Sequence, residues 1–592
     1  MGCFHVTSHL AVIASLTAAA VYAAEPAPVI LISIDTLRAD HLTSYGYRRI
    51  ETPNIDSFAA RGTIFTAIAS QIPLTLPSHT SMFTSTYPFV TRIEENAERV
   101  PSGVVTLASV LRSRGYKTAA FIGSSLLDQS YGLDQGFDFY DSPFHLNSNA
   151  AFNSNAAVNP YDVRVRRDAA LVVRSAEQWL SANRGKPVFV FVHLFDLHTP
   201  YSQPGAVKDR PTIPGYDVQL KYVDEVLGRF KQALVKDGWW DKSLVVLFSD
   251  HGESLGDHGE SSHGYFIYQS TLWVPLLMHW PVGTPARPSR IERSGGLIDL
   301  APTILDILSV PAPSSFQGRS LLPADEGAGR LTYSESLYTY DAFHWSPLRS
   351  LRGGDFKYTE APHPELYNLR DDPREQVNLI RKNSAKAQEL RLQLSRLLTR
   401  FNSTKAVPAR DTSPASAEML RSLGYLSGGS RPSLESGPDP KDRLAEYQLY
   451  ENALAAMYAG QLDHAILTFR KILTLDSRNT LARYYLGESY LKAQKPDAAL
   501  REWDAALSID PNDEPAAEAI GEVWLERQDF EKAREYFERA VAMIANDYTS
   551  QFKLGVAEEH LGMRDSALRH IQSACKLVPD SAECRSELKK LK

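Results

Sequence analysis

The hydrophobic pattern of the chain changes between its larger N-terminal part and its C-terminal part. From Pro28 to about Trp280, short apolar runs rich in β-branched residues alternate with amphipathic segments of helical period, such as 105–113 and 218–234. This alternation predicts an α/β fold, with a mostly parallel sheet covered by helices on both faces. Ligands bind such sheets at the carboxyl ends of the strands. The predicted buried strands are Val29–Ile34, Thr118–Ile122, Val188–Val192, Leu244–Phe248 and Val274–Met278.

Further units follow this α/β part. A smaller subdomain is predicted over 326–400, and residues 401–443, rich in Ser, Pro, Gly and charge, are predicted to form a linker. The α/β domain is then expected to span 25–325 and the last domain 444–592. A chain of 592 residues is too long for one hydrophobic core, which agrees with this division.

The region 444–592 repeats with a period of 34. Frames that start at 446, 480, 514 and 548 align small residues at positions where two helices must approach closely. Period and small positions resemble a tetratricopeptide (TPR) array, an all-α solenoid of four repeats with a capping helix from about Ser581. The resemblance implies a groove that binds a protein or peptide partner. The aligned small residues are Gly487, Gly521 and Gly555, and Ala465, Ala499, Ala533 and Ala567.

The first 24 residues are predicted to be an export signal. Leu10–Ala20 is apolar, and Val21-Tyr22-Ala23 offers small residues for cleavage. A stretch of about 11 residues is shorter than the roughly 20 that span a bilayer. Because the preceding residues contain no Lys or Arg, an uncleaved anchor or a misread start stays open. We expect an exported chain, periplasmic or secreted, with no transmembrane helix in its mature form.

Charge and cysteine content narrow the choice of partners. The net charge of -7 is small, and the chain has no run of Lys or Arg, which argues against nucleic acid. Of the three cysteines, Cys3 would leave with the signal, and none lies in a catalytic context. Cys575 and Cys584 are expected on adjacent helices, either as a disulfide or as two buried thiols.

Polar groups follow two of the predicted strands where each strand ends. Asp35 comes directly after Val29–Ile34, and Asp250 and His251 follow Leu244–Phe248. A carboxylate oxygen beside an imidazole suits a divalent cation such as Zn or Mn. An Asp at a strand end is also often a helix cap, so the combination, rather than either segment, predicts a metal site.

Two other segments and a later histidine carry further candidate chemistry. Thr75 lies before a proline and a predicted helix start, where the positive end of the helix dipole favours an alkoxide and an anionic substrate. Asp196 and His198 follow another strand, and His263 comes after the Asp250 segment. Metal binding, substrate contact and simple packing all remain open for these three.

Taken in order, these segments resemble the sulfatase branch of the alkaline-phosphatase superfamily over about residues 28–380. The run Glu-Leu-Tyr-Asn-Leu at 365–369, with Asp372-Pro373, resembles the C-terminal signature of that branch. The run 249–256 with His263 also resembles the metal segment of phosphoethanolamine transferases, which share the fold.

The chain departs from true sulfatases at the nucleophile. Their formylglycine precursor is a Cys or Ser followed by x-Pro-Ser-Arg, whereas here Thr75 holds that place and His79 replaces the Arg. Their paired acidic ligands become Asp35 and Thr36, and His263 stands where an active-site Lys is usual. A formylglycine hydrate releases sulfate by elimination, which threonine cannot do. A threonyl ester must be cleaved by water at the central atom, as in metal-assisted phosphoryl transfer, so we favour a phosphoester.

The resemblance implies a divalent metal, with Zn or Mn favoured and Ca or Mg possible, and Thr75 as the covalent nucleophile. A second ion or the substrate is expected at Asp196, His198 and His263, and either histidine can protonate the leaving group. The expected ligands of the first ion are Asp35, Thr75, Asp250 and His251.

The remaining polar residues are expected to support the site. His79, His193 and His258 are expected beside the ligands or at the surface, and Arg38 in a structural ion pair. Three functions stay open: hydrolysis or transfer of a phosphoester, hydrolysis of a sulfate ester without formylglycine, and an inactive scaffold for the repeats. The substrate is a small-molecule, lipid or glycan ester in either enzymatic case.

Overall fold

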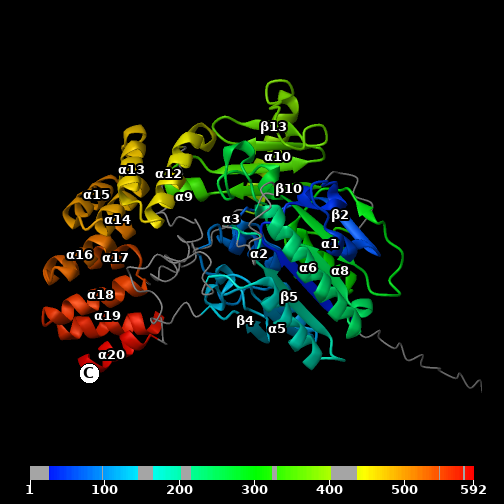
Figure 1. Ribbon diagram of the computed structural model, residues 1–592, viewed down its shortest axis with the longest axis horizontal. Helices are drawn as coiled ribbons and strands as arrows, with labels where there is room; N and C mark the ends of the chain where they lie inside the picture. Colours follow the sequence, from blue (N-terminus) through cyan, green and yellow to red (C-terminus); the bar gives the residue numbers. More distant parts are fainter. Residues whose placement is uncertain are drawn as a thin grey trace, which may run out of the picture.

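The structure is a computed structural model that describes residues 26–96, 98–144, 165–199, 201, 215–322, 330–401, 437–545, 547–577 and 581–592 (Figure 1). The predicted export signal and most of the predicted linker lie outside these residues. Their assignment therefore stays a prediction.

The larger sheet has nine strands within the described residues, in the order β4-β3-β5-β1-β6-β7-β2-β8, with β9 beside β2. The strands from β4 to β6 run parallel, whereas β7 is antiparallel to both β6 and β2. The sheet is thus mostly parallel, as expected. The strands are β1 Val29–Ile34, β2 Gly62–Ala69, β3 Lys117–Phe121, β4 Phe139–Asp141, β5 Val188–Leu194, β6 Leu244–Phe248, β7 Trp273–His279, β8 Arg290–Ile291 and β9 Gly295–Gly296.

Helices cover both faces of this sheet. Because successive side chains of a strand point to opposite faces, Ile30 and Ile32 of β1 pack with α5 and α6, and Val29 and Leu31 belong to the core of α2, α4 and α8. This double burial explains the continuous apolar runs of the strands. The helices of this part are α1 Pro53–Asp56, α2 Thr75–Thr84, α3 Pro88–Thr91, α4 Leu107–Ser113, α5 Ala169–Ala182, α6 Gly215–Lys236, α7 Gln269–Leu272 and α8 Leu300–Ile307.

Two features of the sheet were not expected from the sequence. All five predicted strands are present, but the one at 274–278, now β7, runs antiparallel. Its partner β2 was missed altogether, as were the short strands β4, β8 and β9. An apolar run shows that a strand is buried without showing its direction, and the mixed sequence of Gly62–Ala69 has no long apolar run.

A smaller antiparallel sheet follows, in the order β10-β11-β12-β13. Helix α10, Ser384–Arg400, packs against it through Leu390 and Leu394, which share a core with Tyr333 and Leu351. The helix α9, Tyr338–Phe343, lies between the first two strands in the chain. The strands are β10 Leu331–Ser336, β11 Leu348–Gly353, β12 Phe356–Glu360 and β13 Glu365–Asn368.

The C-terminal part is a stack of helical hairpins beside the α/β part, with α12 next to α9 (Figure 1). The predicted small residues lie where paired helices meet: a Cβ on Gly487 would lie 2.3 Å from Trp503 Nε1, and Ala465 is fully buried. The helices are α12 Leu444–Tyr458, α13 Leu462–Leu475, α14 Thr480–Lys492, α15 Pro496–Ile509, α16 Glu514–Glu526, α17 Phe530–Met543, α18 Tyr548–His560, α19 Arg564–Leu577 and α20 Ala582–Leu591.

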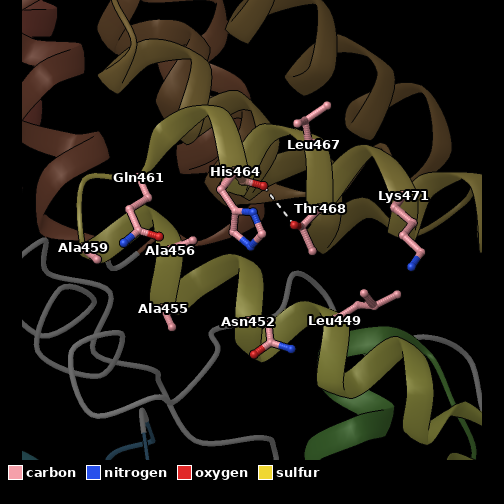
Figure 2. Close-up of a pocket in the computed structure, with 10 residues that line it drawn as sticks. All are labelled: Leu449, Asn452, Ala455, Ala456, Ala459, Gln461, His464, Leu467, Thr468 and Lys471. Atoms are coloured by element: carbon pink, nitrogen blue, oxygen red, sulfur yellow. Dashed lines mark hydrogen bonds between the residues drawn. The ribbon is translucent and has the colours of Figure 1, made fainter.

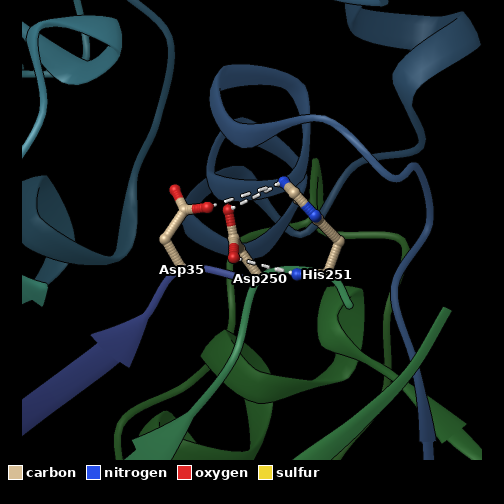
Figure 3. A group of neighbouring side chains, drawn as sticks. All are labelled: Asp35, Asp250 and His251. Carbon is tan, nitrogen blue, oxygen red and sulfur yellow. Dashed lines mark hydrogen bonds and ion pairs between the residues drawn. The ribbon is translucent and has the colours of Figure 1, made fainter. Parts of the chain in front are cut away.

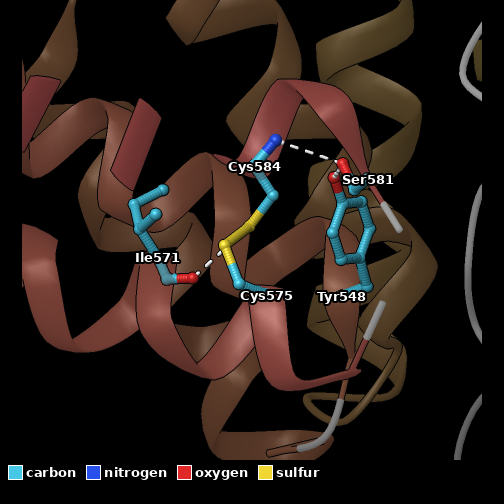
Figure 4. Close-up of a disulfide and its surroundings, with 5 residues drawn as sticks. All are labelled: Tyr548, Ile571, Cys575, Ser581 and Cys584. Carbon is cyan, nitrogen blue, oxygen red and sulfur yellow. Dashed lines mark hydrogen bonds between the residues drawn. A yellow bond between two sulfur atoms is a disulfide. The ribbon is translucent and has the colours of Figure 1, made fainter. Parts of the chain in front are cut away.

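The last helix closes the stack as a cap. Ser581 is its N-cap and accepts a hydrogen bond from the amide of Cys584 at 3.1 Å. A disulfide joins Cys575 of α19 to Cys584 of α20, with the two Cα atoms 5.6 Å apart (Figure 4). Of the two alternatives left open by the sequence, the structure has the disulfide.

One surface groove lies on the first repeat, between α12 and α13 (Figure 2). It has a volume of about 700 Å³, and its lining includes Leu449, Asn452, His464, Leu467 and Lys471. Leu467 of this lining is 65% exposed. Separately, none of the helices that the structure describes has the length and apolar character needed to cross a bilayer.

Candidate active site

Asp35, Asp250 and His251 meet at the carboxyl edge of the larger sheet (Figure 3). The parallel pairing of β1 and β6 sets Ser33 opposite Phe248, so the residues that follow both strands emerge side by side. One ligand atom from each of the three side chains lies within 4.8 Å of the others, and all three residues are buried. The sequence argument from strand ends predicted this meeting.

Each carboxylate has one oxygen held by the protein and one without a partner. Asp250 Oδ1 accepts hydrogen bonds from the amides of His251 at 2.9 Å and Thr36 at 3.3 Å, and His193 Nε2 lies 3.2 Å from Asp35 Oδ2. Among the described residues, Asp35 Oδ1 and Asp250 Oδ2 are buried with no hydrogen-bond partner. The held oxygens fix the orientation of the carboxylates and leave the other two for a ligand.

The imidazole of His251 has the tautomer that a metal ligand needs. Its Nδ1 lies 3.0 Å from the carbonyl oxygen of Gly252, to which it donates, so the lone pair is on Nε2. That Nε2 lies 3.4 Å from Asp250 Oδ2 and 3.9 Å from Asp35 Oδ1. Three buried acceptor atoms that face one another repel unless a cation or protons lie between them, and this donor set fits a divalent cation.

Burial shifts the pKa values of all three groups toward their neutral forms. It raises the pKa of Asp35 and of Asp250 well above the ordinary value, and it lowers that of His251 to about 4. The charge on Asp35 further raises the pKa of Asp250. The cluster therefore lacks compensating positive charge from its own side chains.

Thr75 is the first residue of α2 and is fully buried beside this cluster. Its Oγ1 lies 3.5 Å from His251 Nε2, and the neighbouring Thr75 hydroxyl partly offsets the rise that burial causes in the pKa of the Asp35 carboxyl. The amide of Leu76 donates to Asn96 Oδ1 at 2.9 Å, so the helix N-terminus is partly capped by a side chain. The expected place of Thr75 at a helix start is confirmed.

His79 lies one turn after Thr75 in α2 and is hydrogen-bonded to the backbone of Thr75. Its Nδ1 donates to the carbonyl oxygen of Thr75 at 2.7 Å, and its Nε2 accepts from the Ser33 hydroxyl at 2.9 Å. Burial, with nearby His193, lowers the pKa of His79 well below the ordinary value. The expectation that His79 and His193 lie beside the ligands is confirmed, because His193 contacts Asp35.

His198 and His263 border the cluster as a further pair of imidazoles. Their ring centroids lie 4.9 Å apart, and the His263 ring lies 4.5 Å from that of His251. His198 Nδ1 donates to the Thr199 carbonyl oxygen at 2.6 Å, while His263 Nδ1 lies 2.9 Å from Glu253 Oε1. Burial lowers the pKa of His263 to about 3 and raises that of Glu253 to about 8.

Asp196 has a different environment from the other candidates. Its Oδ1 accepts the amide of Ala169 at 3.3 Å, at the first residue of α5. Burial, with the charge of Asp168, raises its pKa to about 7. Its Oδ2 is buried with no hydrogen-bond partner among the described residues. The contacts of Asp196 support α5, and its role in metal or substrate binding stays a prediction.

The sequence argument missed two residues that lie next to the candidates. Arg166 donates to the carbonyl oxygens of His198 at 3.4 Å and Thr199 at 3.2 Å, and its positive charge partly offsets the rise that burial causes in the pKa of Asp35. Glu253, which contacts His263, lies within the 249–256 run, but no role was expected for its side chain. The only local feature of Arg166 in the sequence is its neighbour Arg167, and a pair of adjacent arginines is more often on a solvated surface.

Arg38 and His258 lie in structural contacts. Arg38 pairs with Asp40 and Asp257, each at 2.8 Å, as expected. The Nε2 of His258 lies 2.9 Å from the carbonyl oxygen of Arg374, and its ring stacks on Tyr268. Neither residue contacts the cluster.

Comparison with known families agrees with this geometry. The model of the sulfatase family matches residues 28–310. The chain carries a sulfatase-family domain. The model of the C-terminal part of N-sulphoglucosamine sulphohydrolase matches residues 256–404, and a tetratricopeptide repeat model matches 450–514 and 518–582. The four-repeat array inferred from the period of 34 is therefore confirmed as tetratricopeptide repeats.

Individual relatives are distant. The chain is 24% identical to N-acetylglucosamine-6-O-sulfatase of Bacteroides thetaiotaomicron, covering 62% of this chain and 85% of that one. It is 23% identical to arylsulfatase K of Xenopus laevis, covering 58% and 76%. The structure of phosphonate monoester hydrolase from Agrobacterium radiobacter superimposes with a TM-score of 0.53 at 21% identity, over 63% of this chain and 96% of that one. These likenesses establish the sulfatase-type fold.

Proposed function

We propose that this protein is a metal-dependent hydrolase, or transferase, of phosphoesters that works through a covalent intermediate on Thr75. The observation that carries the proposal is the placement of the Thr75 hydroxyl at a helix N-terminus, 3.5 Å from His251 Nε2 and beside two unpartnered carboxylate oxygens. A threonine there has no structural need for such neighbours, whereas an activated nucleophile does.

Asp35, Asp250, His251 and Thr75 would hold the cation. When bound, it lowers the pKa of the Thr75 hydroxyl and neutralises charge on the substrate. Manganese and zinc suit a site of one imidazole and several oxygens, and calcium or magnesium remain compatible with the carboxylates.

In the first step, the Thr75 oxygen attacks phosphorus, and the bond from phosphorus to the leaving oxygen breaks. The Asp35 carboxylate, which neighbours the Thr75 hydroxyl, accepts its proton. The leaving oxygen takes a proton from His263 or His198, whichever is in the imidazolium form while the negative charge of the substrate lies beside it. In the second step, water attacks phosphorus and gives a proton to the histidine that protonated the leaving oxygen, while the bond from phosphorus to the Thr75 oxygen breaks. The Thr75 oxygen regains the proton held by Asp35, and phosphate or its monoester is released.

The nucleophile supports a phosphoester over a sulfate ester. Threonine has one hydroxyl, so it cannot eliminate sulfate as a formylglycine hydrate does, and the second attack must occur at the central atom. Structural neighbours of this fold include enzymes named for phosphonate esters as well as sulfatases, which is compatible with either class. Arg166 and the two neighbouring histidines offer positive or hydrogen-bonding groups for the substrate oxygens.

Sulfate ester hydrolysis is the second candidate. The observation that favours it is that the sequence relatives found are named as sulfatases of glycans, aryl esters and steroids. The protein would then cleave sulfate esters through Thr75 or by direct attack of water. A third possibility, an inactive scaffold, is disfavoured because all four expected ligands of the first ion are retained.

The decisive experiment compares the wild type with Thr75→Ala and Thr75→Ser. Each protein is incubated with p-nitrophenyl phosphate, bis(p-nitrophenyl) phosphate or p-nitrophenyl sulfate, with and without Mn²⁺ or Zn²⁺, then quenched in acid and analysed by mass spectrometry. We expect metal-dependent turnover of a phosphoester and a phosphorylated peptide containing Thr75. Thr75→Ala should lose at least about 10³-fold in kcat, and Thr75→Ser should keep part of it. Turnover of the sulfate alone would establish the second candidate, and turnover by Thr75→Ala would rule out the covalent route.

We also propose that the protein acts outside the cytoplasm and that its repeats bind a protein or peptide. The disulfide between Cys575 and Cys584 supports an oxidising compartment. The groove on the first repeat, with exposed Leu467 and Lys471 on its rim, offers apolar and basic contacts to such a partner.

A further inference from the structure

The loop that carries His263 does not rest on the α/β domain alone. It runs from Leu255 to Tyr268, between β6 and α7, and its inner side is fixed by Glu260, whose Oε1 accepts the amide of Tyr265 at 2.9 Å. The amide of Ser254 donates to the carbonyl oxygen of Ser262 at 2.7 Å. These contacts close the loop, but they leave its outer side to be covered by another element.

The first repeat helix, α12, covers that outer side. Gln448 Nε2 donates to the carbonyl oxygen of Gly259 at 3.1 Å, and the Ser261 hydroxyl donates to Glu451 Oε2. The rings of Tyr447 and Tyr265 lie with their centroids 3.7 Å apart. Two successive turns of α12 thus contact the loop within a few residues of His263.

Helix α12 approaches the loop closely enough to restrict which residue can occupy position 259. A Cβ on Gly259, whose φ is +81°, would lie 2.5 Å from Leu444 Cδ2. Only glycine adopts this backbone conformation at low cost and also leaves room for the leucine. A loop that merely passed the repeats at a distance would not need this residue.

The contact is continuous with the interior of both parts. Tyr447 and Tyr450 are each 1% exposed, and the Tyr450 ring lies 5.2 Å from Phe343 of α9 and 5.8 Å from Tyr485 of α14. The buried residues of the α/β part and of the first repeats form a single apolar cluster. The interface therefore behaves as a domain core, and relative motion across it is costly.

We propose that α12 is part of the catalytic unit. Tyr447 and Glu451 are positioning residues that hold residues 255–265 of this loop in place and thereby hold His263 at the proposed metal site. This inference rests on the proposed function for its effect on rate, but its structural statement is independent of it. A ligand that moved α12 would change turnover through this loop.

The test uses the full chain with Glu451→Ala and Tyr447→Ala. The matched variants are Glu451→Gln, which keeps an acceptor for Ser261, and Tyr447→Phe, which keeps the ring against Tyr265. Glu535→Ala, an exposed glutamate of α17, controls for loss of a charge in the repeats. Glu451→Ala and Tyr447→Ala should exchange the backbone amides of 254–265 with deuterium faster than the wild type, whereas Glu451→Gln, Tyr447→Phe and Glu535→Ala should not.

Turnover and metal binding give the second readout. Glu451→Ala and Tyr447→Ala should lose about tenfold in kcat with little change in KM, because His263 is displaced from the leaving group. Their affinity for Mn²⁺, measured by calorimetry, should be kept. If the wild type turns over none of the three esters, the proposed function fails, and the exchange data still decide the positioning. The inference would be overturned if the backbone amides of 254–265 exchanged at the wild-type rate in both Glu451→Ala and Tyr447→Ala.

Discussion

At the scale of single residues, the geometry of the Asp35, Asp250 and His251 cluster depends on which oxygen of each carboxylate is hydrogen-bonded to the protein. Asp250 Oδ1 is held by two amides and Asp35 Oδ2 by His193, so one oxygen of each side chain is directed toward His251. Thr36, with a φ of +57°, provides one of those amides. Strained backbone of this kind is typical of sites whose geometry serves binding.

His193→Ala should therefore weaken metal binding although His193 is not an expected ligand. Without the imidazole, Asp35 Oδ2 loses its partner and the carboxylate can rotate, so the affinity for Mn²⁺ should fall by about 10- to 100-fold. Calorimetric titration of the metal-free protein measures this. His279→Ala is the control, because this buried histidine contacts the carbonyl oxygen of Trp240 and lies outside the cluster. Equal Mn²⁺ affinity in His193→Ala and the wild type would contradict this prediction.

The sequence predicted the cluster but not its surroundings. Asp35 and the Asp250-His251 pair could be found because each directly follows a strongly apolar strand, and parallel strands end at one edge. Arg166 and Glu253 could not, since their importance comes from contacts with His198 and His263 that depend on the tertiary fold. Neither Arg166, beside Arg167, nor Glu253, in a loop, lies in a local pattern that distinguishes it from a surface residue.

At the scale of elements, the repeats were more predictable than the sheet. Helix hairpins that stack at a fixed period place their small residues at fixed spacing, so Gly487 and Ala465 are visible in the sequence itself. The direction of a strand is set by which neighbour it pairs with, and for β7 those neighbours are β6 and β2. The residues of Val274–Met278 themselves do not indicate which strands will pair with them.

Gly487→Val tests the close approach of α14 and α15. The new side chain would meet Trp503, whose indole N–H donates to the Tyr484 carbonyl oxygen at 3.0 Å, so the helices must separate or the indole must lose its bond. We expect a destabilisation of about 1–3 kcal/mol, seen as a lower midpoint of thermal unfolding by circular dichroism. Ala455→Val, at an exposed position of α12, should change the midpoint little. An unchanged midpoint in Gly487→Val would show that the helices do not pack as closely as described.

At the scale of the whole molecule, the first repeat and the last repeat play different parts. Helix α12 contributes Tyr447 and Tyr450 to a core shared with the α/β part. The cluster around Ala567 and Ile571, by contrast, is confined to the last repeat and the capping helix. Solenoid repeats interact mainly with their nearest neighbours, so loss of the distal end should be felt only locally.

Two truncations separate these parts. A chain that ends at Met543 lacks α18 to α20 but keeps every described contact between α12 and the loop at 255–265, so its turnover should stay within about twofold of the wild type, with some loss of repeat stability. A chain that ends at Phe401 lacks α12 and uncovers the rings of Tyr265 and Phe343, and exposed apolar surface of this kind drives association. It should bind the dye 1-anilinonaphthalene-8-sulfonate, elute as aggregates in size-exclusion chromatography and lose turnover. If the shorter chain were monomeric, silent toward the dye and fully active, the α/β part would be complete without its first repeat, and α12 would have to be regarded as an appended partner-binding element.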